Sequence, residues 1–374
     1  TLGEGMGGDS PAATPSDDES RLESARVRLL GIHRVLAAAG EELRQFILEP
    51  GENAISWMET RPNRPFTVNT VPLDVGPLIH DNLFVKNRSV ILTSATLRID
   101  GSFDYLRQRL GVDPEVRELA LGSPFDYPSV ALLYAVSDIP EPQTTGYQKA
   151  VDATLIDLFR ATEGRALALF TSYSQLKAAT SAITQPLAQE GITVLAQGTG
   201  TSRAQLLESF RTGDRVVLMG TRSFWEGIDV PGEALSCLVI VKLPFDVPDD
   251  PIVAARSQLY EDPFGQFMVP EAVLRFLQGF GRLIRTASDQ GVVVVLDRRL
   301  LTKRYGHRFV DSLPDPRVVQ GPGSDLPLVV SRWLDGRSLP ASGLASMSED
   351  EPWLVPSSDE TSGEDEEPSW FWGA

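Results

Sequence analysis

Three polar residues in the C-terminal third of the chain have the types and the spacing to bind a polyphosphate. Gln278, Arg282 and Arg285 form the pattern Q-x-x-G-R-x-x-R at the end of residues 270–284, which the sequence predicts as a helix. At about 100° per residue, a helix places the three within about 60° of one another. Paired guanidinium groups bind oxyanions in bidentate fashion and stabilise charge on a transferring phosphoryl group. The alternative is a pair of surface arginines in ion pairs. The apolar residues of this segment fall on a separate stripe suited to burial: Val273, Leu277, Phe280 and Ile284.

Hydroxyl residues follow two predicted strands, where α/β sheets present polar groups at their carboxyl edge. The first group ends residues 89–96, a predicted buried strand, and the second follows the predicted strand 166–170. Such hydroxyls could relay a change between two bound ligands or hold a phosphate. The alternative is that they cap helix N-termini. The two groups are Thr93, Ser94 and Thr96, and Thr171 and Ser172.

A thirteen-residue string, Gly220–Gly232, follows a third predicted strand at residues 216–219. Its residues include two hydroxyl residues, an aromatic pair and the acid Asp229. An exposed aromatic pair beside hydroxyls would contact a sugar–phosphate backbone, and the acid could accept a hydrogen bond from a ribose hydroxyl or orient an arginine. The alternative for the aromatic pair is core packing. These residues are Thr221, Ser223, Phe224, Trp225 and Asp229.

Composition and missing motifs exclude several classes of site. The 374 residues contain one cysteine, Cys237, so a disulfide within the chain and cysteine-based zinc or iron–sulphur sites are excluded. The three histidines, His33, His80 and His307, are too far apart in the sequence to suggest a metal cluster. No Walker A string, D-E-x-H string or G-x-S-x-G string occurs, and the glycine-rich residues 198–203 are interpreted as a turn. No apolar run of 18 residues or signal pattern occurs, so we expect a cytoplasmic protein without a membrane partner.

The formal net charge of −17 is concentrated at the two ends of the chain. Residues 1–20 carry five acids and residues 341–374 carry nine, and neither segment contains Lys or Arg. Without these acids the charge of residues 21–340 is −3. The overall acidity therefore does not exclude a local basic groove in the folded part.

The order of the predicted elements indicates an α/β fold with a doubly wound parallel sheet. An amphipathic helix is predicted at 19–48, with a break near Gly40, and is followed by two strands, 55–58 and 66–71. Beyond residues 89–96, a helix at 103–110 precedes strands at 115–121 and 131–136, and a proline-rich linker follows at 139–145. Buried strands and helices then alternate, as in a parallel sheet covered on both faces. The predicted strands of this part are 166–170, 193–196, 216–219, 235–241 and 291–296, and its helices are 147–161, 173–190, 203–211 and 270–284.

Read in order, these motifs resemble those of superfamily 2 helicases, and in particular the DinG/XPD branch of ATP-dependent DNA helicases. The resemblance runs from about residue 71 to residue 316, and the Phe-Trp-Glu-Gly and Gly-Arg-x-Ile-Arg strings are its most specific parts. It implies two RecA-like lobes of the P-loop NTPase type. The implied divisions are a disordered acidic segment (1–20), the end of a helical, arch-like insertion (21–65), the end of the first lobe with its connection (66–140), the second lobe (145–320) and a disordered acidic tail (338–374).

The resemblance also implies roles for individual residues. Residues matching Gln278, Arg282 and Arg285 face the nucleotide across the cleft between the lobes, and the last acts as an arginine finger. Others contact the nucleotide, contact the nucleic-acid backbone, or couple the two. The implied ATP-binding residues further include Gly227 and Asp229, the nucleic-acid-binding residues are Thr171, Ser172, Thr221 and Ser223, and the coupling residues are Thr93, Ser94, Thr96 and Glu226.

The family's Walker A lysine, its D-E-x-H acids and its cluster cysteines belong to a part that precedes the matching region. We therefore expect this chain to be the C-terminal half of a helicase that uses ATP and Mg²⁺, inactive alone because most ligands of both lie in the other half. The presence of an iron–sulphur cluster is undetermined. Expected partners are single-stranded DNA and the N-terminal lobe. The acidic and aromatic residues 364–372 could dock on a basic protein partner or compete for the single-strand site, and the alternative is a solvated disordered end. The alternative function is a non-catalytic module that binds single-stranded nucleic acid or a partner protein.

Overall fold

The computed structural model describes residues 17–48, 51, 53–60, 64–225, 234–286, 288–339 and 345–346, which divide into two compact units, Thr1–Asp74 and Val75–Ala374. Several predictions fall outside the described residues. They concern residues 1–16, the coupling and nucleotide-binding residues Glu226, Gly227 and Asp229, and nearly all of the acidic tail.

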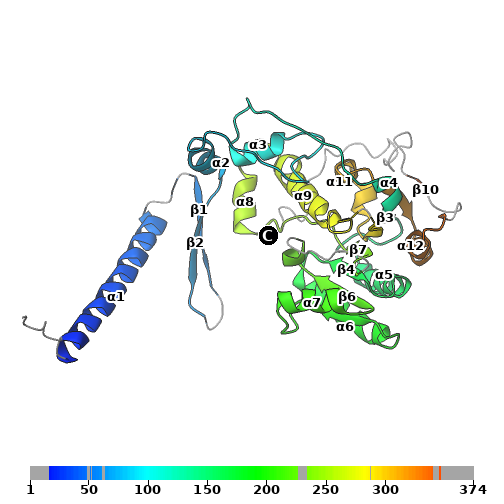
Figure 1. Ribbon diagram of the computed structural model, residues 1–374, viewed down its shortest axis with the longest axis horizontal. Coiled ribbons are helices and arrows are strands. Elements are labelled where there is room, and N and C mark those ends of the chain that lie inside the picture. The colour runs from blue at the N-terminus through cyan, green and yellow to red at the C-terminus, as the bar shows by residue number, and fades with distance from the viewer. Residues whose placement is uncertain are drawn as a thin grey trace, which may run out of the picture. The chain divides into compact units, whose positions relative to one another are not determined.

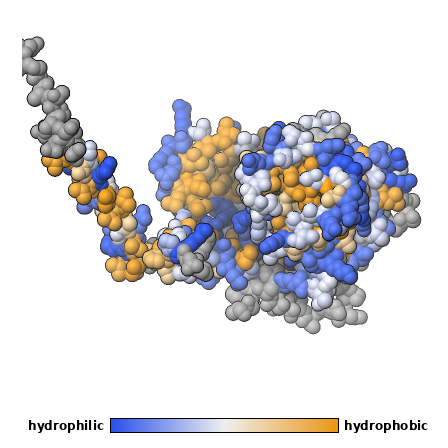
Figure 2. Space-filling view, turned by 90° about the horizontal axis from the view of Figure 1, so that it is seen from below, coloured by the Kyte–Doolittle hydropathy of each residue, from blue (hydrophilic) through white to orange (hydrophobic). Residues whose placement is uncertain are grey.

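The first unit consists of one long helix and a two-stranded antiparallel sheet. Helix α1 (Asp17–Leu48) continues through Gly40, where a break was predicted. Strands β1 (Ala54–Glu59) and β2 (Thr67–Pro72) confirm the two predicted strands and pair along their whole length (Figure 1). Apolar surface runs along α1 in Figure 2, and most of its large apolar side chains are 43–70% exposed.

The second unit is built on one eight-stranded sheet, which confirms the predicted parallel α/β fold. The strand order is β10-β9-β3-β8-β7-β4-β6-β5, and every pairing is parallel except that of β10 with β9. The central strands are apolar runs that are buried on both faces, as the sequence predicted. The strands are β3 (Ala131–Val136), β4 (Ala166–Leu169), β5 (Thr193–Ala196), β6 (Val216–Gly220), β7 (Cys237–Ile240), β8 (Gly291–Val295), β9 (Arg317–Gly321) and β10 (Ala345–Ser346).

Helices cover both faces of this sheet and form two hydrophobic cores (Figure 1). Alternate residues of each strand enter opposite cores, so that Leu132 packs on one side and Leu133 on the other. One core includes α5 (Tyr147–Ala161), α6 (Tyr173–Ala188) and α12 (Leu326–Leu334). The other includes α7 (Arg203–Thr212), α8 (Pro251–Ser257), η3 (Phe264–Met268), α9 (Val269–Phe280), α10 (Arg299–Thr302) and α11 (Gly306–Asp311).

Strand β3 lies in the interior of this sheet, between β8 and β9. The sheet therefore begins at Ala131, before the proline-rich residues 139–145, although the sequence had suggested that the second lobe begins after them. It also extends past the expected end at residue 320, to Gly321 of β9 and to β10, which lies within the tail that was expected to be disordered.

The prediction of a buried strand at residues 89–96 is wrong. These residues are irregular, and Ile91 is 89% exposed. Residues 115–121 are not a strand either. Apolar composition favoured strands in both places, but a strand also needs a neighbour to pair its backbone groups, and no described strand lies beside either segment. The elements formed around these segments are α2 (Gly76–Ile79), η1 (His80–Phe84), α3 (Asp104–Leu110) and α4 (Tyr127–Val130), of which α3 confirms the predicted helix.

Candidate functional site

Thr171 and Thr221 lie side by side at the carboxyl edge of the sheet. Leu169 of β4 pairs with Gly220 of β6, and the Phe170 N–H donates to the Gly220 carbonyl at 2.9 Å. The two threonines follow these pairs directly. Parallel pairing thus brings together two of the hydroxyl residues that the sequence singled out, although they are fifty residues apart in the chain.

Gln197 fixes the position of Thr221. Its Oε1 accepts hydrogen bonds from the Thr221 backbone N–H at 2.9 Å and from the Thr221 hydroxyl at 2.8 Å. Gln197 directly follows β5, and its own N–H donates to the Met219 carbonyl at 3.0 Å. The sequence indicated only a turn at Gln197, because the partner that gives this side chain its role lies 24 residues further on.

Ser172 caps the N-terminus of α6, as the structural alternative for these hydroxyls proposed. Its side chain accepts from the Gln175 N–H at 3.3 Å. The following Tyr173 lies against Gly198, whose φ is +89° and where an added Cβ would fall 1.3 Å from the Tyr173 hydroxyl oxygen. Glycine is therefore required at position 198 for both its backbone conformation and the close approach of the ring.

The expectation of an exposed Phe224-Trp225 pair is wrong, and the core-packing alternative is confirmed. Phe224 and Trp225 are 0% and 3% exposed. Phe224 is the last residue of the short 3-10 helix η2 (Arg222–Phe224), and Trp225 follows it directly. Trp225 packs against Gly279 of α9, where an added Cβ would lie 3.1 Å from the indole ring. The aromatic pair therefore connects the carboxyl edge of the sheet to α9.

A pocket of about 140 Å³ opens beside Thr171, and Asp246 holds two arginines there. Arg222 donates from one guanidinium nitrogen to Asp246 Oδ1 at 2.9 Å, and Arg275 donates to Asp246 Oδ2 at 2.5 Å. Arg275 comes from α9, and Arg222 from η2. The sequence singled out none of the three charged residues, because only the fold brings them together.

The predicted helix at 270–284 ends earlier than expected, so the arrangement of Gln278, Arg282 and Arg285 on one helix face is wrong. Helix α9 ends at Phe280, and only Gln278 lies within it. Glycine is a poor helix former, and Gly279 and Gly281 flank the final residue of the helix.

The two arginines follow in the turn and loop after α9. Arg282 is half-buried and Arg285 is exposed. The Oε1 atom of Gln278 is buried and has no hydrogen-bond partner among the described residues. Leu283 packs over Gly291, the first residue of β8, so this segment lies beside the amino end of that strand. It is separate from the carboxyl edge that holds Thr171, and α9 connects the two places.

Asp289 holds the loop that carries Arg285. Its Oδ2 accepts from the backbone N–H groups of Arg285 and Thr286, both at 2.8 Å, and its Oδ1 accepts from the Thr286 hydroxyl at 2.7 Å. Burial acts to raise the pKa of the Asp289 carboxyl, but the hydrogen bonds from Thr286 and from the two N–H groups outweigh burial and lower that pKa below its ordinary value. The carboxylate is therefore ionised at neutral pH and fixes the backbone at Arg285.

A buried ion pair supports the loop that contains Asp246. Asp297 follows β8 and is 1% exposed; Arg299 donates to both of its oxygens, at 2.9 and 2.7 Å. The Leu243 N–H donates to Asp297 Oδ2 at 2.9 Å, and the Arg299 guanidinium lies 5.7 Å from the centre of the Phe245 ring. Burial acts to lower the pKa of Arg299, but Asp297 outweighs burial and raises it, so Arg299 stays charged.

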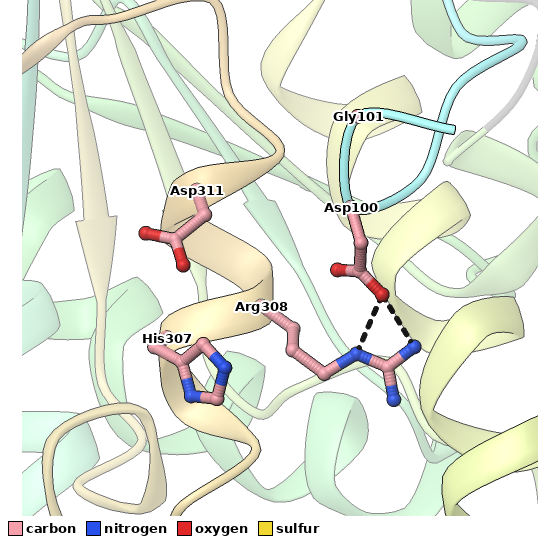
Figure 3. A pocket seen from close by; sticks show the side chains of 5 residues that line it. All are labelled: Asp100, Gly101, His307, Arg308 and Asp311. Atoms are coloured by element: carbon pink, nitrogen blue, oxygen red, sulfur yellow. Dashed lines mark hydrogen bonds and ion pairs between the residues drawn. The ribbon is translucent and has the colours of Figure 1, made fainter.

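A second pocket, of about 470 Å³, is lined by residues of two distant segments (Figure 3). Its main contact is the ion pair of Asp100 with Arg308 of α11, whose two donated bonds to Asp100 Oδ2 are 2.9 and 2.7 Å long. Arg308 also donates to the Gly265 carbonyl at 2.9 Å. These contacts tie the segment before α3 to α11 and η3. No group of three or more potential metal ligands occurs among the described residues.

The predicted coupling residues Thr93, Ser94 and Thr96 line neither of the two pockets described above. Thr93 and Ser94 are exposed, and the hydroxyls of Ser94 and Thr96 lie 3.3 Å apart. The described part of the chain contains no helix long and apolar enough to span a membrane.

Comparison with known proteins shows what part of this chain is similar to. Residues 155–316 match the model of the helicase C-terminal domain, a range that contains Thr171, Thr221 and Arg285. The chain matches the C-terminal part of DinG/XPD-type superfamily 2 helicases. The fold agrees: a solved XPD helicase structure superimposes with a TM-score of 0.53 at 17% identity, covering 83% of this chain and 57% of that one.

Three relatives illustrate the match. The chain is 39% identical over 269 residues to the 3'-5' exonuclease DinG of Bacillus subtilis, covering 70% of this chain and 29% of that protein. It is 38% identical to the ATP-dependent DNA helicase YoaA of Escherichia coli over 69% of this chain and 40% of YoaA. It is also 38% identical to the ATP-dependent helicase DinG of Mycobacterium tuberculosis, over 71% of this chain and 41% of that protein. The chain thus spans well under half the length of these relatives.

Proposed function

We propose that this chain is the C-terminal motor lobe of an ATP-dependent DNA helicase of the DinG type, coupling ATP hydrolysis to movement along single-stranded DNA and to unwinding. The observation that carries the proposal is the row of hydroxyls at the carboxyl edge, where Thr171 and Thr221 adjoin the N-terminus of α6 and the arginine pocket. Hydroxyls, a helix N-terminus and an arginine can all donate to phosphate oxygens, and such contacts carry no sequence information.

The proposal assigns a role to each residue that the sequence motifs indicated. Thr171, Ser172, Thr221 and Ser223 contact successive phosphates, so binding is independent of sequence. Gln278, Arg282 and Arg285 contact the nucleotide, and Asp289 fixes the backbone that carries Arg285. Gly227 and Asp229 complete the nucleotide contacts, and coupling runs through Glu226, Thr93, Ser94 and Thr96.

The nucleotide requires a second lobe. The sequence contains no Walker A or D-E-x-H string, which in P-loop motors hold the phosphates and Mg²⁺. We therefore propose that an N-terminal lobe supplies these groups, and that this chain alone does not hydrolyse ATP. The exposed apolar residues of α1 are consistent with this proposal, since a continuous apolar surface normally packs against further protein.

Binding of single-stranded DNA by the chain tests the proposal. We expect a fluorescein-labelled oligothymidylate of about 20 nucleotides to bind with an anisotropy change, and a mixed sequence of equal length to bind with similar affinity. The logarithm of the affinity should fall linearly with the logarithm of salt concentration, with a slope of about −0.7 for each phosphate contacted. Absence of binding at about 50 mM salt would contradict the proposed role of the carboxyl edge.

Replacing Gln197 with alanine should weaken this binding. The substitution removes the acceptor of both Thr221 hydrogen bonds, so that the threonine is no longer held beside Thr171. A loss of about 1 kcal/mol, or roughly fivefold in affinity, is expected in the same anisotropy assay. Gln189→Ala, at an exposed glutamine that follows α6, serves as the matched control and should bind like the unmodified chain. Equal affinities for the two variants would show that Gln197 does not position the site.

A further inference from the structure

We propose that Asp246 is an exchangeable counter-ion: it holds Arg222 and Arg275 together when no nucleic acid is bound, and it yields Arg222 to a backbone phosphate when a single strand enters. This inference rests on the proposed function, because it names a further phosphate-binding residue and its regulator at the same edge. Arg222 lies within the string Gly220–Gly232, but the sequence assigned no role to it or to Asp246.

The two arginines differ in how firmly they are held. The Arg275 side chain is 12% exposed, and that of Asp246 is 9% exposed. Arg275 also donates to the Pro244 carbonyl at 3.2 Å and lies 3.6 Å from Glu271. Arg222 is 70% exposed, and its described polar contact is the bond to Asp246. An ion pair with an exposed partner is weak. Of the two ion pairs of Asp246, the one with Arg222 is therefore the one that a phosphate can replace.

Arg222 lies where an entering backbone would pass. It stands between Thr221, fixed by Gln197, and Ser223, whose carbonyl accepts from Arg203 Nε at 3.1 Å. The pocket that Arg222 lines also contains Thr171. A phosphate here would meet the exposed guanidinium of Arg222. The Asp246 carboxylate opposes that phosphate, because it neutralises Arg222 and adds a negative charge nearby.

The exchange would also change the contacts of α9. When Arg222 leaves, Asp246 retains only Arg275, which lies one turn before Gln278 on the same helix. Glu271, one turn earlier, accepts from the Tyr105 hydroxyl of α3 at 2.7 Å. A continuous line of polar contacts thus joins the phosphate-binding edge to α9 and α3. The ion pair of Arg222 with Asp246 is the contact in this line that lies nearest to the proposed nucleic-acid site.

The test compares four variants of the 374-residue chain in the oligothymidylate anisotropy assay, each measured from about 50 to 200 mM salt. Asp246→Asn should raise affinity roughly threefold to tenfold and steepen the salt slope, because Arg222 is released while the amide oxygen still accepts from Arg275. Asp249→Asn removes the same charge from an exposed residue three positions away and should change affinity less than about twofold.

Arg222→Gln should lower affinity roughly threefold to tenfold and reduce the salt slope by about 0.7. Because the Arg222 side chain is exposed, we expect this variant to fold, and it tests the inference even if Asp246→Asn does not fold. In the double variant, Asp246→Asn should add less than about twofold. Wild-type affinity of Arg222→Gln, or equal gains for Asp246→Asn and Asp249→Asn, would overturn the inference alone. Failure of the unmodified chain to bind would overturn the proposed function and the inference with it.

Discussion

Replacing Arg285 with alanine should lower the single-strand-stimulated ATPase rate of a complete DinG-type protein carrying this chain by about 10³-fold. An arginine finger stabilises the charge that develops on the transferring γ-phosphoryl group, and it acts without reorganisation when its backbone is already fixed. Asp289 supplies that fixation through the two N–H groups at Arg285 and Thr286. The rate should be measured with saturating single strand and Mg²⁺.

The control for this experiment is Arg211→Ala, at an exposed arginine of α7 whose described ion pair is with Glu208 on the same helix. This variant should retain the rate within about twofold, since a surface pair contributes little. Single-strand affinity should be the same in both variants, because Arg285 lies beside the amino end of β8 and Thr171 lies at the opposite edge of the sheet. A fall of less than about tenfold for Arg285→Ala would show that Arg285 is not the finger.

Replacing Asp297 with asparagine should destabilise the fold by about 3 kcal/mol or more. The substitution is nearly isosteric, but it leaves the guanidinium of Arg299 buried without its counter-charge, and Arg299 is only 13% exposed. The Leu243 N–H also loses a charged acceptor. Equilibrium unfolding in urea should show the change as a lower midpoint with a similar slope.

Asp315→Asn is the matched control for stability. Asp315 is exposed and has a φ of +58°, a conformation that asparagine adopts readily. We expect its unfolding free energy to lie within about 0.5 kcal/mol of the unmodified chain. If Asp297→Asn unfolded at the same denaturant concentration as Asp315→Asn, the buried pair would not be what supports the loop before Asp246.

The parallel sheet could be predicted because its strands carry their own signal. Runs such as residues 166–170 and 291–296 are apolar throughout, which is characteristic of strands buried on both faces. The same signal failed at residues 89–96, where apolar residues have no described strand to pair with, and Ile91 is exposed. Composition shows that a segment can be buried, whereas pairing depends on what lies beside it.

The sequence predicted only those site residues that belong to motifs at the ends of predicted strands and helices. Thr171 and Thr221 follow strands that pair, so their meeting at one edge follows from the topology. The end of α9 was misplaced because the apolar stripe continues past it: Ile284 is buried as predicted, yet it lies in irregular structure after the helix. Contacts between distant polar residues, such as those of Asp246 and Gln197, leave no periodic trace in a sequence.

The central claim is that this chain is one half of a motor whose nucleotide chemistry needs the other half. The most direct measurement is ATP hydrolysis with single-stranded DNA and Mg²⁺, by the 374-residue chain alone and by a longer protein in which a P-loop lobe precedes it. We predict turnover only in the longer protein, and loss of that turnover with Arg285→Ala. Turnover by the chain alone, or turnover in the longer protein that is indifferent to Arg285, would contradict the account.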